Sequence, residues 1–468
     1  MPHSSPENRR AFLGHGLGAI ALTSLLNGDL AGQEPRDGKA SARSLPAKVK
    51  RVIFLTMSGG PSHLETFDYK KKLAEMDGQP MPESFTRGQP IAQLQGQKLK
   101  CQGPLTRFRQ YGSHGQTISD FLPFHAKMAD DICIIKSMVT EQINHDPAHT
   151  FMNTGSAING RPSMGSWINY GLGSESKDLP GFVVLSSVGG RNPQPIASRQ
   201  WSAGFLPSRF QGVEFNSSGD PVHYVTNPQG VNREQQKKLI QTINRLNRIQ
   251  NKTIQHPEIR TRIAAYELAF RMQTAVPELM DMSDEPQHVL DQYGAKPGDG
   301  SYASNCLLAR RLAERGVRFI HLYHRGWDHH GGLVKYMNTC CGLTDKPTWA
   351  LIQDLKQRDM LKDTLVVWGG EFGRTPMFQG KGGAGRDHHI KGFSMWMAGG
   401  GVRGGISHGA TDELGYHSVD NVVHVRDLHA TMLHLLGIDH RKFSVKYQGL
   451  DMKLTGVEDA RVVRDILA

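Results

Sequence analysis

The chain has 468 residues, of which 38% are hydrophobic, so it can bury the core of one large α/β domain or of two or three smaller ones. Its net charge of +11 favours anionic ligands, but it has no zinc-finger spacing and no basic motif with aromatic residues, so we expect no nucleic-acid partner. The five cysteines are odd in number and include no Cys-x-x-Cys pair, which argues against a disulfide framework and a thiolate zinc site.

The first residues are typical of an export signal. Residues 8–13 (NRRAFL) resemble the twin-arginine motif, and the stretch 14–28 has no Asp, Glu, Lys or Arg. This stretch is too short for a membrane span, which needs roughly 20 apolar residues, and no other segment qualifies. We therefore predict a twin-arginine-type signal over 1–32, a linker over 33–48, and export to the periplasm or the medium by the twin-arginine machinery. A disordered basic tail is the alternative.

From residue 49 onward, apolar runs alternate with helical patterns. Continuous apolar runs predict buried strands, and apolar side chains three to four residues apart predict helices. The predicted strands are 52–57, 181–185, 317–323, 364–368 and 393–398, and the predicted helices are 302–315, 349–361 and 427–437. This order predicts an α/β fold with an open, mostly parallel sheet covered by helices on both faces.

Two segments depart from this alternation. Residues 225–290 are charged and contain two helical patterns, at 235–248 and 258–272, so we predict a helical insertion there. Residues 69–112 are polar and rich in Gly, Pro and Gln, and we expect a long loop. We expect residues 49–468 to form one domain that contains both segments.

Three glycine-rich loops carry acidic and imidazole side chains, and two of them follow predicted strands. They are 326–331 (GWDHHG), 369–374 (GGEFGR) and 385–389 (GRDHH). In an extended loop, Asp328 and His330 point together and His329 points away. An Asp and a His on one face are a plausible half of a site for Zn, Mn or Fe. A hydrogen-bonded Asp–His pair without metal is the alternative.

The second and third loops supply further candidates. Glu371 lies where a strand opens into glycines, and we predict it to be a metal ligand; a structural pair with Arg374 is the alternative. In the third loop His388 is the predicted ligand. Arg374 and Arg386 are candidates to hold an anionic substrate group, because guanidinium binds sulfate and phosphate in a bidentate manner, although each could equally be a solvated charge.

Residues 144–155 (NHDPAHTFMNTG) predict the start of a helix. Pro147 suits the first turn of a helix, whose N-terminus presents free N–H groups to an anion. His145, Asp146 and His149 would then surround this N-terminus. Capping by Asp146 without further function is the alternative.

These motifs resemble a known family. The chain looks like domain of unknown function 1501, within the alkaline-phosphatase-like (sulfatase) superfamily. The resemblance runs from about residue 51 to the C-terminus, over 57–63 (MSGGPSH), 144–155, 160–167 (GRPSMGSW), the three glycine-rich loops and 427–439 (DLHATMLHLLGID). It implies an alkaline-phosphatase-like fold and hydrolysis of sulfate or phosphate esters, with two metal ions around a nucleophile at a helix N-terminus.

The chain departs from the superfamily pattern in two places. The first strand of the superfamily ends in a metal-binding Asp, whereas this strand ends in 58–59 (SG), which leaves His63 or Asp68 to supply the ligand. When residues 145–155 are aligned with the nucleophile segment of sulfatases, His145 takes the position of the nucleophile and His149 that of the arginine. No Cys or Ser is therefore available there for conversion to formylglycine. His145 could be a nucleophile through nitrogen, a metal ligand, or neither.

The function expected from the sequence is that of an exported metal-dependent hydrolase of sulfate or phosphate esters. The expected substrate is a small anionic ester or a sulfated or phosphorylated carbohydrate, and the cofactor is a divalent metal (Zn, Mn, Ca or Fe). The predicted metal ligands are Asp328, His330, Glu371 and His388, and the predicted catalytic residues are His145, His149 and Arg374. The alternative is a non-catalytic exported protein of the same fold that binds a carbohydrate or a partner.

Overall fold

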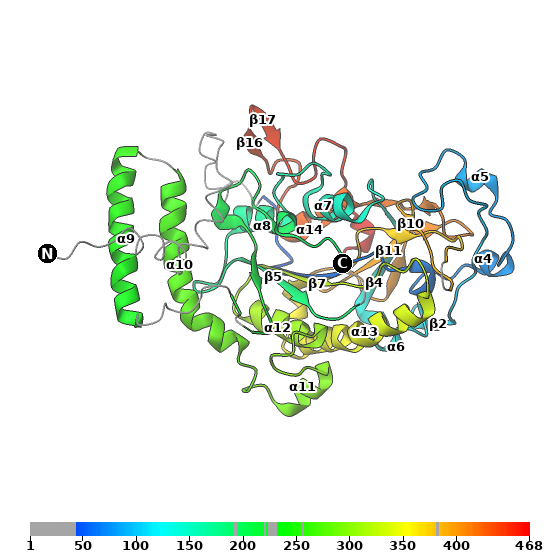
Figure 1. The fold of residues 1–468 in the computed structure, drawn as a ribbon, viewed down its shortest axis with the longest axis horizontal. Helices are drawn as coiled ribbons and strands as arrows, with labels where there is room; N and C mark the ends of the chain where they lie inside the picture. Colours follow the sequence, from blue (N-terminus) through cyan, green and yellow to red (C-terminus); the bar gives the residue numbers. More distant parts are fainter. Residues whose placement is uncertain (1–43, 191–193, 220, 223–231, 255–256, 381–382) are drawn as a thin grey trace, which may run out of the picture.

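The structure is a computed structural model that describes residues 44–190, 194–219, 221–222, 232–254, 257–380 and 383–468 (Figure 1). The predicted signal, 1–32, and most of the predicted linker lie outside the described residues. No helix among the described residues is long and apolar enough to cross a membrane.

Within the described residues, a nine-stranded sheet forms the centre of the molecule, in the order β12-β4-β11-β8-β1-β7-β5-β6, with β15 beside β4. The strands are β1 (Arg51–Met57), β4 (Ile132–Val139), β5 (Phe182–Ser187), β6 (Val213–Phe215), β7 (Phe319–His324), β8 (Thr364–Gly369), β11 (Phe393–Ala398), β12 (Ile406–His408) and β15 (Val423–His424). Strand β11 is antiparallel to β4 and β8, and the other pairs are parallel. The predicted mostly parallel sheet is confirmed.

Helices cover both faces of the sheet, because the side chains of a strand alternate between two cores. On one side, α12 (Tyr302–Glu314) and α13 (Leu333–Gln357) pack on Ile53 and Leu55. On the other, α8 (Met164–Leu172) and α14 (Val425–Leu435) pack on Val52 and Phe54. Figure 1 shows α7 (His145–Thr154) on the same side as α8 and α14. Buried on both faces, the central strands are apolar runs without polar alternation.

Several element boundaries differ from the sequence prediction. Helix α13 begins at Leu333 rather than at 349 and continues through Pro347, although proline disfavours the interior of a helix. Strand β4 was not predicted, because Lys136 interrupts its apolar run. Helix α14 begins at Val425 rather than 427, since His424 caps it and Asp427 completes the capping box. The expected long loop, 69–112, contains two short helices, α4 (Lys71–Glu75) and α5 (Glu83–Thr86).

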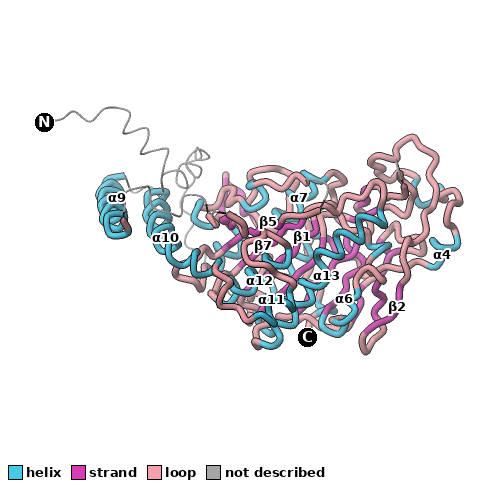
Figure 2. Tube along the Cα trace, turned by 60° about the horizontal axis from the view of Figure 1, so that its bottom comes forward, coloured by secondary structure: helices cyan, strands magenta, loops and turns pink. Residues whose placement is uncertain are grey.

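The predicted helices at 235–248 and 258–272 are confirmed and extended. They form α9 (Arg233–Ile254) and α10 (Pro257–Met280), which pack against each other. Figures 1 and 2 show that this hairpin projects from one end of the molecule, with α9 as its outer helix. Helix α10 also contacts α12, which connects the hairpin to the sheet.

Candidate metal centre

The candidate site lies where three adjacent strands end. Strand β1 runs between β7 and β8, parallel to both. Asp328 and His330 follow β7, Gly59 follows β1, and Glu371 follows β8. Because parallel strands present their carboxyl ends at one edge, these loops meet there, which is where α/β sheets bind ligands.

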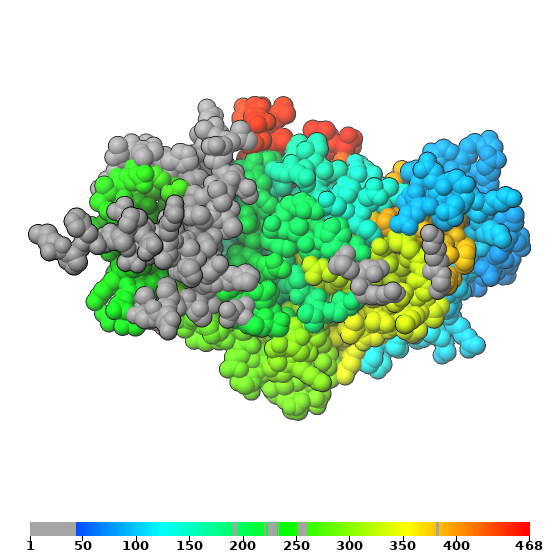
Figure 3. Space-filling view, viewed as in Figure 1, coloured from blue at the N-terminus to red at the C-terminus, as the bar shows by residue number. Residues whose placement is uncertain are grey.

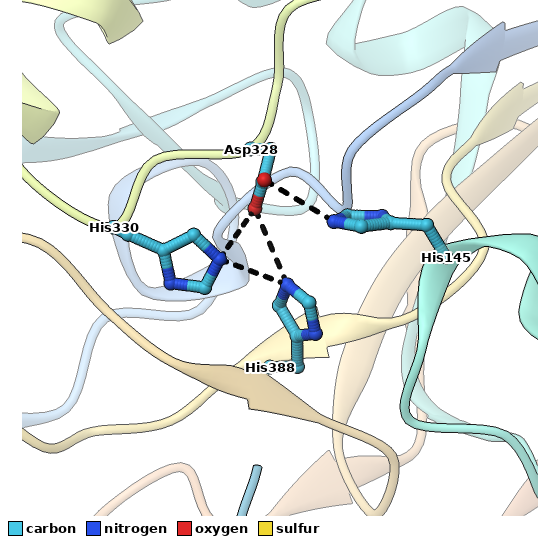
Figure 4. Close-up of side chains that lie close together, drawn as sticks. All are labelled: His145, Asp328, His330 and His388. Atoms are coloured by element: carbon cyan, nitrogen blue, oxygen red, sulfur yellow. Dashed lines mark hydrogen bonds and ion pairs between the residues drawn. The ribbon is translucent and has the colours of Figure 1, made fainter. Parts of the chain in front are cut away.

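Four side chains converge at this edge (Figure 4), and we call them the His₃Asp cluster: His145, Asp328, His330 and His388. The Nε2 atom of His330 lies 2.9 Å from Asp328 Oδ1 and 3.0 Å from His388 Nε2. The Nε2 atom of His388 lies 3.2 Å from the same Oδ1, and that of His145 lies 3.3 Å from Asp328 Oδ2. The cluster thus joins the loop after β7, the short strand β10 (His388–His389) and the N-terminus of α7.

An oxygen acceptor holds the Nδ1 atom of each of these histidines. His145 Nδ1 lies 2.7 Å from Glu371 Oε1, and His388 Nδ1 lies 2.8 Å from the carbonyl oxygen of Ile143. His330 Nδ1 lies 2.6 Å from the amide oxygen of Gln379. Since these oxygens only accept, each Nδ1 donates its proton, and in the neutral rings the lone pairs at Nε2 point into the cluster.

This donor set fits a divalent metal. A tetrahedral ion with bonds of about 2.0–2.1 Å spaces its ligands about 3.3 Å apart. The three imidazole nitrogens lie 2.9–3.3 Å from the oxygens of Asp328, and the donor atoms all lie within 4.8 Å of one another. Metal-binding histidines typically donate the other ring proton to a carboxylate or a carbonyl, as all three do. The Gln93 side-chain nitrogen, 3.2 Å from His330 Nε2, would have to give up that contact.

The charges around the cluster also favour a cation. Burial tends to raise the pKa of Asp328, but the Arg374 guanidinium and the contacts with the imidazoles hold it well below its usual range. Burial tends to lower the pKa of His145, but its contacts with Asp328 and Glu371 outweigh burial and raise it to about 9. Asp328 and Glu371 carry two negative charges and only Asp328 pairs with Arg374, so a proton on His145, or a metal ion, offsets the remaining charge.

Glu371 belongs to a second group, with His145 and His149, next to the His₃Asp cluster. Its fully buried carboxylate accepts hydrogen bonds from the backbone N–H of Gly59, at 3.0 and 3.1 Å, and from His145 Nδ1. His149 Nε2 lies 3.3 Å from Glu371 Oε1, and neither of its ring nitrogens has a hydrogen-bond partner among the described residues. Glu371 therefore ties the loop after β1 to the imidazole of His145.

The position of Arg374 does not fit the predicted binding of a substrate anion. The residue is fully buried, and its guanidinium donates to the carbonyl oxygens of Gly60 (2.9 Å), Gly59 and Trp327 and to Asp328 Oδ1 (2.7 Å). Its nitrogens face the protein interior, so Arg374 positions Asp328. The predicted alternative, a pair between Glu371 and Arg374, does not form either, because Glu371 binds His145 and Gly59.

The other candidates from the sequence lie outside the cluster. Arg386 is buried and pairs with Glu65 at 2.7 Å rather than facing an anion. His63 Nε2 contacts the carbonyl oxygen of Gly415, and Asp68 pairs with Lys70, so within the described residues neither replaces the missing Asp of the first strand. Asp146 forms an ion pair with Arg199 at the surface.

The third loop contributes one side chain to the cluster. Asp387 accepts the backbone N–H groups of Gln93 and Leu94, at 2.7 and 2.9 Å, and His389 contacts the carbonyl oxygen of Tyr416. Of these three side chains, His388 is the one that lies beside Asp328, at 3.2 Å, and its role as a metal ligand stays a prediction. The sequence analysis missed Gln379 and Gln93, since neither stands in a recognisable motif.

The chain is similar to several solved structures. A sulfatase from Pseudoalteromonas sp. is 12% identical, with a TM-score of 0.34, over 98% of this chain and 77% of that chain. A mutant of TAB5 alkaline phosphatase is 12% identical, with a TM-score of 0.31, over 78% and 95%. Ps i-CgsB, solved with k-i-k-neocarrahexaose, is 9% identical, with a TM-score of 0.33, over 83% and 72%. At such low identities and TM-scores, these similarities do not establish the chemistry of this chain.

A second comparison concerns the sequence itself. No curated protein matches the chain. The model of the family described as "Protein of unknown function (DUF1501)" matches residues 49–467, nearly the whole region over which the motifs indicated this resemblance. The chain therefore belongs to the DUF1501 family.

Proposed function

We propose that this protein is an exported, metal-dependent hydrolase of sulfate or phosphate esters. The observation that carries the proposal is the His₃Asp cluster, in which three imidazoles with anchored Nδ1 atoms point their Nε2 atoms at one carboxylate. A divalent metal held there supplies Lewis acidity toward an anionic ester oxygen and lowers the pKa of a bound water.

The chain's own residues have distinct roles in this proposal. Asp328, His330, His388 and His145 hold the metal, Glu371 orients His145, and Arg374 orients Asp328. His149 stays neutral at neutral pH, because burial lowers its pKa, and it contacts Glu371. One ring nitrogen of His145 contacts Glu371 and the other contacts Asp328. We therefore infer that a water molecule, and not this side chain, attacks the ester.

A reactant can reach the cluster from solvent. The side chains of Asp328 and His145 are each 15% exposed, and that of His330 is 23% exposed. A tetrahedral ion held by all four side chains would have no free position, so hydrolysis requires water or substrate as a fifth ligand, which would enter from the exposed side. The partial exposure supports the hydrolase over a purely structural metal.

One observation favours the binding alternative, a non-catalytic protein of the same fold. The two arginines of the glycine-rich loops, Arg374 and Arg386, are buried in ion pairs, so neither offers an anion clamp. A protein that retains a metal without hydrolysing esters would then bind a carbohydrate or a partner at this edge of the sheet.

Export by the twin-arginine route rests on residues 8–13 alone, and its test is the location of the protein in cell fractions.

The test of the metal site compares two Asp→Asn variants. We expect purified wild-type protein to hold about one equivalent of a divalent transition metal, measured by mass spectrometry of the metal content. Asp328→Asn removes the central carboxylate and should lose the metal. Asp146→Asn is the control, since Asp146 neighbours His145 but pairs with Arg199 at the surface. Equal metal content in wild type and Asp328→Asn would refute the metal site.

The reaction is tested with the same proteins. Wild type and Asp146→Asn should hydrolyse members of a panel of aryl sulfates and aryl phosphates, and Asp328→Asn should lose turnover by about 10³-fold or more. Bound metal without turnover on any ester would favour the binding alternative. Turnover that survives in metal-free Asp328→Asn would contradict metal-dependent hydrolysis.

A further inference from the structure

The outer helix of the hairpin, α9, exposes apolar side chains. Leu239 is 36% exposed, Leu246 62% and Ile249 55%. With Thr242 they are spaced three and four residues apart, so they form one stripe along the helix, which we call the outer stripe. The face toward α10 is a different one, where Gln236, Ile240 and Asn244 are buried.

Positive charge borders the outer stripe. Between residues 234 and 250, four exposed cations, Lys237, Lys238, Arg245 and Arg248, stand against one acid, Glu234. Lys238 lies four residues before Thr242 and Arg245 four residues before Ile249, so both lie along its edge. Lys238 also pairs with the exposed Glu234 at 3.2 Å. Figure 3 shows the hairpin as a green projection at the left end of the molecule.

A cationic cavity lies on the opposite face of α9 from the outer stripe. A space of about 320 Å³ between α9 and α10 is lined by Lys237, Arg248 and Arg271, with Glu267 as its acid. Asn244, which is 3% exposed, lines it too, and its Oδ1 atom has no hydrogen-bond partner among the described residues. Because Ile240 and Asn244 belong to the face toward α10, this cavity is separate from the outer stripe.

A second copy of this chain is a poor occupant for the stripe. Stripes with this spacing pair in coiled coils when the flanking positions carry opposite charges. Here the flanks carry Lys238 and Arg245, so two copies would bring like charges together. An amphipathic helix with Lys and Arg beside an apolar stripe instead suits the surface of an anionic bilayer, with the apolar side chains below the headgroups.

We propose that the outer face of α9 docks on membranes rich in anionic phospholipid. Leu239, Leu246 and Ile249 enter the headgroup region, and Lys238 and Arg245 contact lipid phosphates. The contact is peripheral and reversible, since three apolar side chains bury little area. It is independent of the His₃Asp cluster, which belongs to the sheet edge.

The test is flotation of the full chain with vesicles. Wild type should bind vesicles of phosphatidylcholine mixed with phosphatidylglycerol, less at high salt, and should not bind phosphatidylcholine alone. The double variant Leu246→Ser with Ile249→Ser should bind at least about tenfold more weakly. Leu450→Ser with Val457→Ser is the matched control, since these side chains are 65% and 98% exposed elsewhere and should not matter.

The remaining outcomes separate other ligands from lipid. Equal binding to both vesicle types, or binding unchanged by the Leu246/Ile249 variant while far-ultraviolet circular dichroism shows a native fold, would overturn the proposal. If binding is lost only in the double variant Lys238→Gln with Arg245→Gln, the proposal is also overturned, and the face is a site for soluble polyanions. Full competition by glycerol phosphate would lead to the same conclusion. Asp328→Asn should bind vesicles like wild type.

Discussion

Single atoms decide what the side chains of the candidate site can do. His145, His330 and His388 each commit Nδ1 to an oxygen acceptor, which turns every Nε2 toward Asp328. Arg374 commits its guanidinium to backbone carbonyls and to the same Asp328. Glu371 reaches the site through His145 rather than by a direct contact with the cluster. The geometry therefore separates groups that would touch a metal from groups that hold those ligands in place.

A substitution at Glu371 can show whether this residue binds the metal directly or holds a ligand in place. In Glu371→Gln the amide oxygen can still accept the Nδ1 proton of His145, but the charge that strengthens this imidazole is gone. We expect metal affinity to fall by about 10–100-fold, as measured by competition with a chelator, whereas Asp328→Asn should lose the metal. Loss of the metal in Glu371→Gln to the same extent would show that Glu371 is a direct ligand, as the sequence suggested.

At the scale of single elements, helix α7 brings two histidines to the sheet edge and depends on its C-terminal glycine. Gly155 has φ of 69°, a left-handed conformation that ends the helix. A Cβ atom at this position would lie 2.2 Å from the carbonyl oxygen of Leu454. Helix α11 (Gln287–Tyr293) ends in the same way at Gly294, with φ of 71°, but a Cβ there would meet nothing within 4 Å.

These two glycines form a matched pair for stability measurements. Gly294→Ala carries only the left-handed strain and should lower the free energy of unfolding by about 1 kcal/mol. Gly155→Ala adds the clash with Leu454 and should cost about 2–5 kcal/mol, measured by urea unfolding. An equal decrease in the free energy of unfolding in the two variants would mean that the backbone at Leu454 moves away from the added methyl group without loss of stability.

At the scale of the whole molecule, the fold buries several neutral histidines. Burial lowers the pKa of His324 and His429 to about 4 and that of His321, His329 and His389 to about 3. His429 is fully buried in α14, and its Nε2 atom lies 2.8 Å from the carbonyl oxygen of Met152 in α7. It therefore links two helices on one face of the sheet in its neutral form.

The pH dependence of stability follows from this burial. Between about pH 6.5 and about pH 4 the unfolded chain binds a proton at His429 that the folded chain does not, so stability falls with falling pH. The full difference is on the order of 3 kcal/mol. His429→Gln should flatten the pH dependence of the free energy of unfolding by up to this amount, measured by denaturant titration. The exposed His288→Gln is the control, and an equal slope in both variants would contradict the account.

Much of the fold was readable from the chain. The central strands are buried on both faces, so β1, β5, β7, β8 and β11 are apolar runs that sequence alone identifies. Strand β4 was not predicted because Lys136 interrupts its apolar run. The start of α13 was not predicted because the helix contains Pro347, and proline usually ends a helix. Local signals fail where tertiary packing overrides them.

The sequence by itself determined the α/β class, the family, and which loops carry the candidate site residues, since hydrophobic period and motif identity are properties of the chain. It also placed Asp328 and His330 on one face by their spacing. Only the tertiary structure decided that His145, 226 positions from Glu371, donates to its carboxylate, and that Arg374 is buried beneath Asp328. Such contacts depend on strand order and loop conformation, which have no period in sequence and arise when distant segments pack together.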